Sequence, residues 1–347
     1  MLTVYTTAQS EQWDGVVRSF KDHDIYWLSG YVKAFQLHGD GEPLLFFVET
    51  EGARGINVVM KRDVAQSPYF AGRIPEGEYF DFTTPYGYGC WLIEGDDTGE
   101  LFRLYEDWLK KNGIVSEFVR FHPMLKNHIP CEGFYDVIRL GEVVHLDLSS
   151  PEAIWNNMSS KNRNVIRKAV KNDVQIYNGR FPAIYERFRA IYDGTMDRDN
   201  AEKYYYFDAP FYRSVLDDLP LNAQVFWAEK DGEIIAASII LAANGRLNYH
   251  LSGSLREYSS LAATNLLLYR AALWGCEHGF STFYLGGGVG SEEDSLFKFK
   301  RAFYKGELNR YCIGRRIFDQ EKYDALVGMR PPIDSGFFPK YRAPADE

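Results

Sequence analysis

The chain repeats one order of elements twice, and this repeat limits the possible folds more than any single motif does. Each half of the 347 residues holds a strand pair joined at a Gly turn, then a helix that stops at Gly, then a strand. Identical residues occupy equivalent places: Phe46, Glu49 and Gly52 match Phe226, Glu229 and Gly232 at a shift of 180, and Trp108 and Gly113 match Trp274 and Gly279 at a shift of 166. We therefore predict an internal duplication of one α/β unit.

Hydrophobic periodicity and turn residues place the elements of each half. In the first half we expect helices at 9–21, 27–35 and 98–112, and strands at 44–49, 55–60 and 118–121. In the second half we expect helices at 151–172, 181–196, 209–218 and 261–277, and strands at 174–177, 224–229, 234–242, 246–252 and 282–285. This order favours an α/β fold with two tandem domains, each a mixed sheet flanked by helices. The expected boundaries are 1–144 for the first domain and 145–347 for the second, which includes a C-terminal extension.

The motifs of several enzyme classes are missing from the sequence. The Gly-rich run at 286–290 follows a predicted strand, but Glu292, Glu293 and Asp294 come next and would repel a pyrophosphate. The sequence holds no Walker motif, no G-x-S-x-G and no H-E-x-x-H. The four cysteines are far apart and form no C-x-x-C pair, so we expect reduced thiols and no metal site. Nucleotide-fold, serine-hydrolase and zinc-enzyme interpretations are therefore unsupported.

The location of the protein is also predicted from what the sequence lacks. No run approaches 18 apolar residues, so we expect no membrane span. The N-terminus, Met1 to Tyr5, has no basic region followed by an apolar one. We therefore expect a cytoplasmic protein.

The charge of the chain is unevenly distributed. The net charge is −9, which argues against a general nucleic-acid or membrane binder. Residues 159–172 nevertheless carry +5 and residues 296–316 carry +6, which leaves −20 for the remainder. Two basic islands in an acidic protein indicate a local anionic ligand, and the alternative is a pair of solvated basic faces.

Four segments carry a resemblance to a known family. The segment Leu296-Phe297-Lys298-Phe299-Lys300-Arg301-Ala302-Phe303, the strand end Tyr284-Leu285-Gly286-Gly287 and the basic stretch 159–168 together resemble the Fem-type (FemABX-like) peptidyltransferases. The segment 84–89, Thr-Pro-Tyr-Gly-Tyr-Gly, also looks like this family. The resemblance covers nearly the whole chain and implies two tandem GNAT-like domains, in agreement with the predicted duplication.

The resemblance also implies roles for individual residues. Phe299 and Lys300 look like the family's Phe-Lys pair, whose lysine is thought to stabilise the tetrahedral oxyanion. Lys300 is favoured over Lys298 because Phe299 to Phe303, which includes Arg301, fits the Phe-Lys-x-x-Phe register. The expected substrate-binding residues are Arg163 and Arg167, one helical turn apart, together with Arg301, Tyr249 and Lys33. In the early helix the family's phosphate-contacting lysine falls on either Lys33 or Phe35.

The resemblance implies an acyltransferase enzyme that moves an amino acid from aminoacyl-tRNA to an amine of a peptidoglycan-precursor-like acceptor. No cofactor is implied beyond the donor substrate. Two alternatives stay open. The first is an acyl-CoA-dependent N-acyltransferase in polysaccharide or secondary-metabolite synthesis, although residues 256–262 lack the glycines of a GNAT pyrophosphate loop. The second is a non-catalytic GNAT-fold binding protein.

Overall fold

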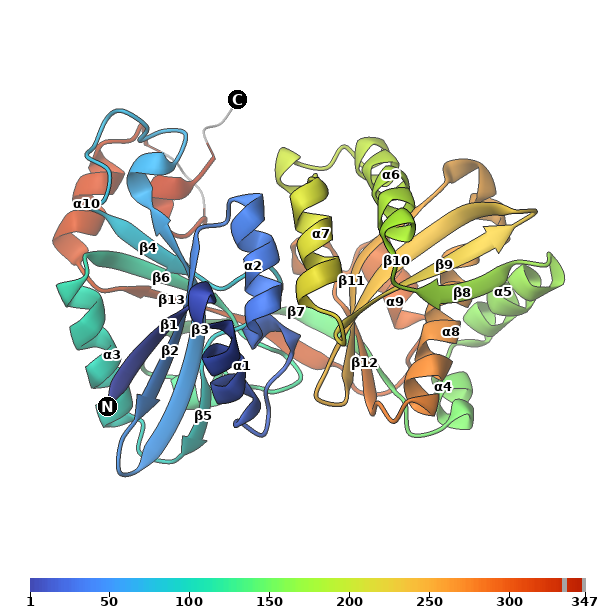
Figure 1. Ribbon diagram of the computed structural model, residues 1–347, viewed down its shortest axis with the longest axis horizontal. Helices are drawn as coiled ribbons and strands as arrows, with labels where there is room; N and C mark the ends of the chain where they lie inside the picture. The colour runs from blue at the N-terminus through green and yellow to red at the C-terminus, as the bar shows by residue number, and fades with distance from the viewer. Residues whose placement is uncertain (333–335, 345–347) are drawn as a thin grey trace. The chain divides into compact units, whose positions relative to one another are not determined.

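The computed structural model describes residues 1–332 and 336–344 (Figure 1). The chain divides into two compact units. The first unit comprises Met1–Leu140 and the C-terminal stretch that begins at Tyr311, and the second comprises Gly141–Arg310. The break near residue 140 lies close to the expected boundary at 144.

The first unit is a mixed sheet with helices on it. Its strands run in the order β1-β2-β3-β4-β6-β13, and β5 pairs with β3. Neighbours are antiparallel except β4 and β6, which are parallel. Its elements are β1 (Leu2–Thr6), α1 (Ser10–Arg18), α2 (Ser29–His38), β2 (Glu42–Glu49), β3 (Ala53–Asp63), β4 (Phe80–Thr83), β5 (Leu92–Gly95), α3 (Gly99–Lys111), β6 (Ile114–Arg120), β13 (Asn309–Ile317) and α10 (Gln320–Gly328).

The second unit has the same arrangement. Its strands run in the order β7-β12-β11-β10-β9-β8, and here β11 and β12 are the parallel pair. Its elements are β7 (Asp136–Asp147), α4 (Pro151–Asn157), α5 (Ser160–Lys171), β8 (Gln175–Gly179), α6 (Pro182–Arg198), α7 (Ala209–Asp218), β9 (Ala223–Lys230), β10 (Glu233–Ala243), β11 (Arg246–Ser254), α8 (Ala263–Glu277), β12 (Thr282–Gly286) and α9 (Ser295–Arg301). The α/β class and the repeated element order are confirmed.

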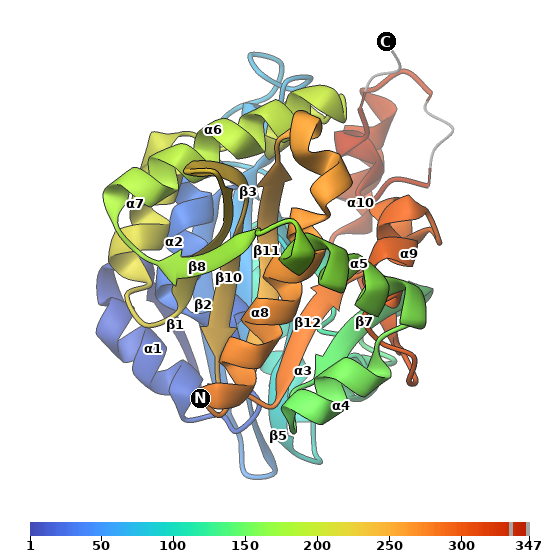
Figure 2. The ribbon, with the colours of Figure 1, turned by 90° about the vertical axis from the view of Figure 1, so that its right-hand side faces the viewer.

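Helices cover both faces of each sheet, as a two-sided α/β architecture requires. In the second unit α6 and α7 lie on one face, and α4, α5 and α8 lie on the other (Figures 1 and 2). The core on the α8 side joins Leu266, Leu267 and Ala271 of α8 to Phe226 and Phe283 of the sheet. In the first unit α3 fills the equivalent place, where Leu101, Tyr105 and Leu109 pack against Phe46 and Phe82.

The last strand of each sheet comes from an unexpected part of the chain. β13 follows β12 in the sequence but pairs with β6 of the first unit, while β7 follows β6 and pairs with β12 of the second unit. The expectation that the chain after β12 extends the second domain up to residue 347 therefore differs from the structure. Residues 333–335 and 345–347 of that range lie outside the described residues.

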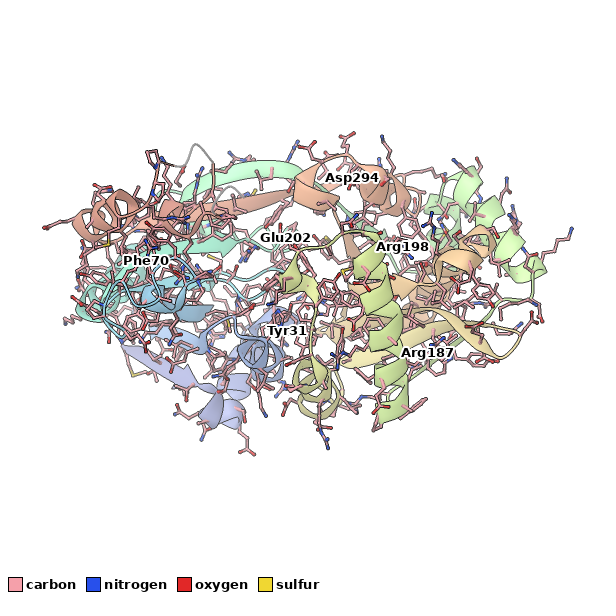
Figure 3. All side chains as sticks on the ribbon, turned by 90° about the horizontal axis from the view of Figure 1, so that it is seen from above. Tyr31, Phe70, Arg187, Arg198, Glu202 and Asp294 are labelled. Atoms are coloured by element: carbon pink, nitrogen blue, oxygen red, sulfur yellow. The ribbon has the colours of Figure 1, made fainter. Side chains whose placement is uncertain are left out.

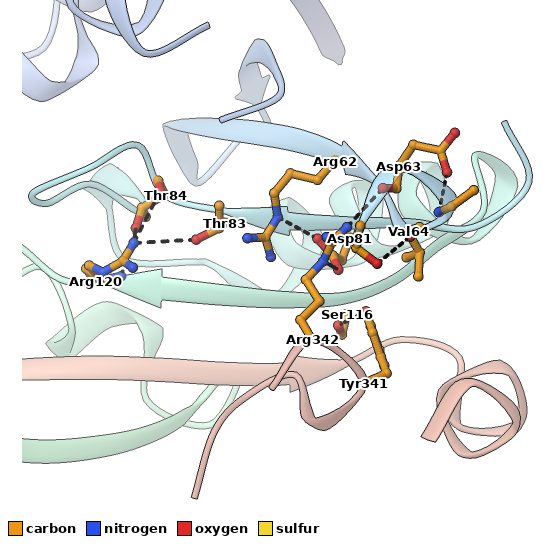
Figure 4. A network of polar contacts seen from close by, with 12 residues as sticks. Arg62, Asp63, Val64, Asp81, Thr83, Thr84, Ser116, Arg120, Tyr341 and Arg342 are labelled. Atoms are coloured by element: carbon orange, nitrogen blue, oxygen red, sulfur yellow. Dashed lines mark hydrogen bonds and ion pairs between the residues drawn. The ribbon is translucent and has the colours of Figure 1, made fainter. Parts of the chain in front are cut away.

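Polar contacts fix the C-terminal segment to the first unit (Figure 4). The guanidinium of Arg342 donates to the carboxylate of Asp81, which also accepts from Arg62 Nε at 2.7 Å. The hydroxyl groups of Tyr341 and Ser116 lie 2.8 Å apart. Asp81, Ser116 and Tyr341 are all fully buried, so this end of the chain is part of the first unit's core.

Candidate functional site

Lys300 is a buried ammonium in the second unit. It lies in α9, only 8% exposed, and its Nζ donates to the carbonyl oxygen of Gly287 at 2.6 Å. Burial lowers the pKa of Lys300 to about 8, and the negative charge of Asp294 opposes this shift. At pH 7 Lys300 is therefore still protonated in most molecules of the protein, so it can donate a hydrogen bond to a developing oxyanion.

The local sequence holds Lys300 in place. Asp294 caps α9, because its Oδ1 accepts from the backbone N of Phe297 at 2.8 Å, and Asp294 lies at the start of that helix (Figure 3). Gly286, which ends β12, has a φ of +86°, and a Cβ built there would lie 3.3 Å from Lys300 Nζ. At Gly288 a Cβ would lie 2.1 Å from the carbonyl oxygen of Glu292, so only glycine fits. The register in the sequence points to Lys300 but not to Asp294 as its partner, although Asp three residues before Phe297 is a typical N-cap pattern.

The two neighbours of Lys300 in the predicted site have structural contacts. Phe299 is half-buried, and its ring meets that of Phe303 edge-on at 5.5 Å. Arg301 Nη1 donates to the carbonyl oxygens of Tyr304 at 2.7 Å and Gly306 at 2.8 Å. These bonds hold the turn after α9, so the guanidinium of Arg301 is already engaged with backbone.

Arg163 and Arg167 lie on α5, but their surroundings differ. The stretch 151–172, expected as one helix, is broken at Met158, and Ser159 caps α5 by accepting from Asn162 N at 3.2 Å. Arg163 Nη1 donates to the carbonyl oxygen of Met158 at 2.6 Å, at the end of α4. Arg167 is exposed and its guanidinium carbon lies 5.0 Å from the centre of the Trp155 ring. The two arginines therefore do not form a shared clamp with both guanidinium groups available.

The remaining predicted residues lie on different elements. Tyr249 is half-buried on β11, packs against the α8-side core, and has its pKa raised by burial. Lys33 is exposed on α2 of the first unit, and Phe35 on the same helix is buried and stacks on Tyr86 at 5.5 Å. Between these two positions, only Lys33 offers a charge at the surface.

The basic island at 296–316 is not one surface. Besides the engaged Lys300 and Arg301, Arg316 of the first unit forms an ion pair of 2.7 Å with Glu106, and the half-buried Arg315 forms one of 3.7 Å with Asp136. The exposed members of the island are Lys298, Lys305 and Arg310. A sequence charge of +6 therefore corresponds to only three cations exposed to solvent.

Residues 1–332 and 336–344 contain neither a metal-binding cluster nor a membrane-spanning helix. No group of three or more His, Cys, Asp or Glu side chains there is arranged to hold a metal ion. No helix of these ranges is long and apolar enough to cross a membrane.

Comparisons with known proteins agree with this fold. Residues 160–301 match the family model described as an acetyltransferase (GNAT) domain. The structure of FemX is similar over 94% of this chain and 99% of that chain, at 13% identity and a TM-score of 0.69. The structure of L-PGS from Bacillus licheniformis is similar over 94% of this chain and 98% of that chain, at 13% identity and a TM-score of 0.55. A tandem GNAT protein from the clavulanic acid biosynthesis pathway is similar over 92% and 99% of the two chains, at 9% identity and a TM-score of 0.51.

These similarities are to structures and to one domain model. No curated protein sequence matches the chain. At identities of 9–13% the structural matches establish the fold, a tandem GNAT-like arrangement over most of the chain. The domain model covers the second unit from α5 to the end of α9, the part that contains Lys300.

Proposed function

We propose that the protein is an aminoacyltransferase that moves an amino acid from aminoacyl-tRNA to an amine of a peptidoglycan-precursor-like acceptor. The observation that carries this proposal is the buried ammonium of Lys300, in the Phe-Lys-x-x-Phe register and next to the strand end at Gly286. The tandem fold shared with FemX, and with L-PGS, supports the same class of donor.

The proposed reaction needs an oxyanion donor more than it needs a nucleophile on the protein. The acceptor amine attacks the ester carbonyl of the charged tRNA, so a C–N bond forms and the carbonyl oxygen becomes negative. The C–O bond to the terminal ribose then breaks, and the ribose hydroxyl leaves with the proton that the amine releases. Lys300 stabilises the negative oxygen, because a compact ammonium in a dry site interacts more strongly as charge develops.

The second candidate is an acyl-CoA-dependent N-acyltransferase. The specific observation in its favour is that the matching domain model is that of an acetyltransferase. Residues 256–261, in the place of the pyrophosphate loop, form a 3-10 helix, and Glu257 lies in its first turn. An acid at that place is unfavourable for a diphosphate, so we rank this function second.

A transfer assay with both donors in parallel tests the proposal. Purified protein is given tRNA charged with labelled amino acids, or labelled acetyl-CoA, together with amine acceptors that include peptidoglycan precursors. We expect label to pass to the acceptor from charged tRNA only, and Lys300→Met to abolish most of that transfer. Transfer from acetyl-CoA alone would establish the second candidate, and no transfer from either donor would favour a binding protein without catalysis.

A further inference from the structure

A surface groove in the second unit lies between α4, α5 and α8, and Arg167, one of the expected substrate-binding residues, lines it. Its volume is about 490 Å³, which falls in the range of small-ligand sites. Two aromatic rings line it, Trp155 of α4 and Tyr269 of α8, with centroids 5.2 Å apart. Ile166 and Val170 of α5 add apolar surface, and Val170 is 52% exposed.

Positive charge borders this groove. Arg167 lines it, with its guanidinium 5.0 Å from the centre of the Trp155 ring, and Lys171 follows one helical turn later. Lys161 and Lys168 are also exposed on α5. Over residues 1–332 and 336–344, no acidic side chain lies within ion-pair distance of these four cations. Glu152 of α4 is the one acid that lines the groove.

The basic side chains of α5 repel one another along the helix. Arg163, Arg167 and Lys171 succeed one another at i, i+4 spacing, where like charges destabilise an isolated helix. Arg163 donates to the neutral Met158 carbonyl at the end of α4, and Arg167 Nη1 donates to the neutral Asn164 Oδ1 at 2.9 Å, so neither contact supplies a compensating negative charge. A bound polyanion would remove the repulsion.

We propose that this groove and α5 bind a single-stranded RNA segment, with a base against the aromatic rings and phosphates on Arg167 and Lys171. Stacking platforms interleaved with cations are the usual means of holding unpaired nucleotides. A duplex fits the groove less well, because its bases are already stacked on one another. The proposal rests on the proposed function, since a charged tRNA ends in unpaired nucleotides at its 3′ terminus.

Fluorescence anisotropy of a labelled single-stranded RNA of about 12 nucleotides tests this surface directly. We expect the double variant Arg167→Ala/Lys171→Ala to bind RNA on the order of 10-fold or more weakly. The slope of log affinity against log salt should become shallower by about 1.4, because each phosphate that is no longer neutralised removes about 0.7. Tyr269→Leu, which keeps an apolar side chain, should weaken binding on the order of 10-fold without changing that slope.

The matched control is Arg213→Ala, an exposed arginine on α7 of the same unit, which should leave RNA affinity unchanged. Equal affinity of the α5 double variant and the unmodified protein would overturn the proposal, as would binding to anionic lipid vesicles that these substitutions abolish while RNA binding persists. Thermal melts of each variant confirm that it is folded.

The two proposals fail separately. If α5 variants keep full transfer from charged tRNA and Lys300→Met does not, the RNA surface lies elsewhere and the proposed function stands. If the protein binds RNA through α5 but transfers acyl groups from acetyl-CoA only, the function is wrong and the surface remains.

Discussion

Lys300 offers the sharpest test, because its role as an oxyanion donor depends on a proton that it loses near neutral pH. With a pKa of about 8, about nine-tenths of the side chains are protonated at pH 7 and about a tenth at pH 9. A donor role therefore predicts that the rate of transfer, kcat, falls as the pH rises through 8. A general-base role predicts the opposite sign, a rise in kcat through the same pH.

Two substitutions separate these roles. Lys300→Met should lower kcat on the order of 100-fold and change KM little, as expected for the loss of one oxyanion donor. Lys300→Arg keeps its proton to high pH, so its residual activity should lack the alkaline fall near pH 8. The comparison variant is Lys298→Met on the exposed side of the same helix, which should mainly raise KM for an anionic donor at low salt.

These rates are measured with labelled charged tRNA over a series of buffers, after a melt has shown that each variant is folded. Near-normal kcat in folded Lys300→Met would refute the argument and leave Lys300 as a structural residue that holds the Gly287 carbonyl. An alkaline fall that persists unchanged in Lys300→Arg would show that another group titrates.

Three further outcomes follow from the contacts of buried charges. Asp294→Asn keeps a good N-cap for α9 but removes the negative charge that raises the pKa of Lys300. The alkaline fall in kcat should therefore move below pH 8, which pH–rate profiles of this variant and the unmodified protein would show. Burial raises the pKa of Glu117 to about 7, although hydrogen bonds from Tyr135, Asn57 and Tyr105 oppose this shift. As the pH rises, the unfolded chain therefore loses the Glu117 proton before the folded protein does. The free energy of unfolding should then fall by roughly 3 kcal/mol between pH ~4.5 and ~7. Glu117→Gln should remove that part of the pH dependence in urea denaturation, and an unchanged curve would contradict the assignment. Asp81→Asn leaves Arg62 and Arg342 without their carboxylate and should lower the free energy of unfolding by about 3 kcal/mol. The control, Asp217→Asn at the exposed pair with Arg213, should lower it by at most about 1 kcal/mol in the same denaturation series.

The elements that sequence reasoning found are those with strong local signals. The helix expected at 209–218 is α7, and the strand pair expected at 224–229 and 234–242 is β9 and β10. In these segments the apolar pattern and the turn at Asp231-Gly232 specify the structure without help from distant residues. The break between α4 and α5 was missed because the local pattern stays helical on both sides, although Ser159 carries an N-cap signal.

The strands β7 and β13 could not be found in this way. Charged residues interrupt the apolar pattern of both strands without regular alternation, such as Arg139 and Glu142 in β7 or the adjacent Arg315 and Arg316 in β13. Their partners are set by topology, since β13 pairs with β6 across nearly the whole second half of the chain. Local patterns carry no information about such pairing, which explains why the C-terminal stretch is expected in the second domain but lies in the first unit.

For the site, residue type was predictable but the direction of each side chain was not. Lys300 was identified from its register, while Arg163 and Arg301 were expected to bind substrate and are engaged with backbone carbonyls. An arginine that donates to the backbone carbonyls at a helix end and one that binds a phosphate both use their guanidinium N–H groups. Only the contacts distinguish them, and these depend on how α4 ends and how the chain turns after α9.

The duplication explains why the proposed chemistry belongs to one unit. In the first unit the chain after β4 continues along β6, because Gly89 N donates to Arg120 O at 2.8 Å and Gly89 pairs with Phe121. In the second unit the parallel pairing of β11 with β12 covers only Arg246–Asn248, and the chain after β12 enters the Gly-rich turn and α9. The segment after β6 has instead a short 3-10 turn at Ile129–Cys131, and its lysine, Lys126, is exposed and not buried like Lys300. The same sheet is thus present twice, but only the second copy has a buried ammonium at the end of its central parallel strand.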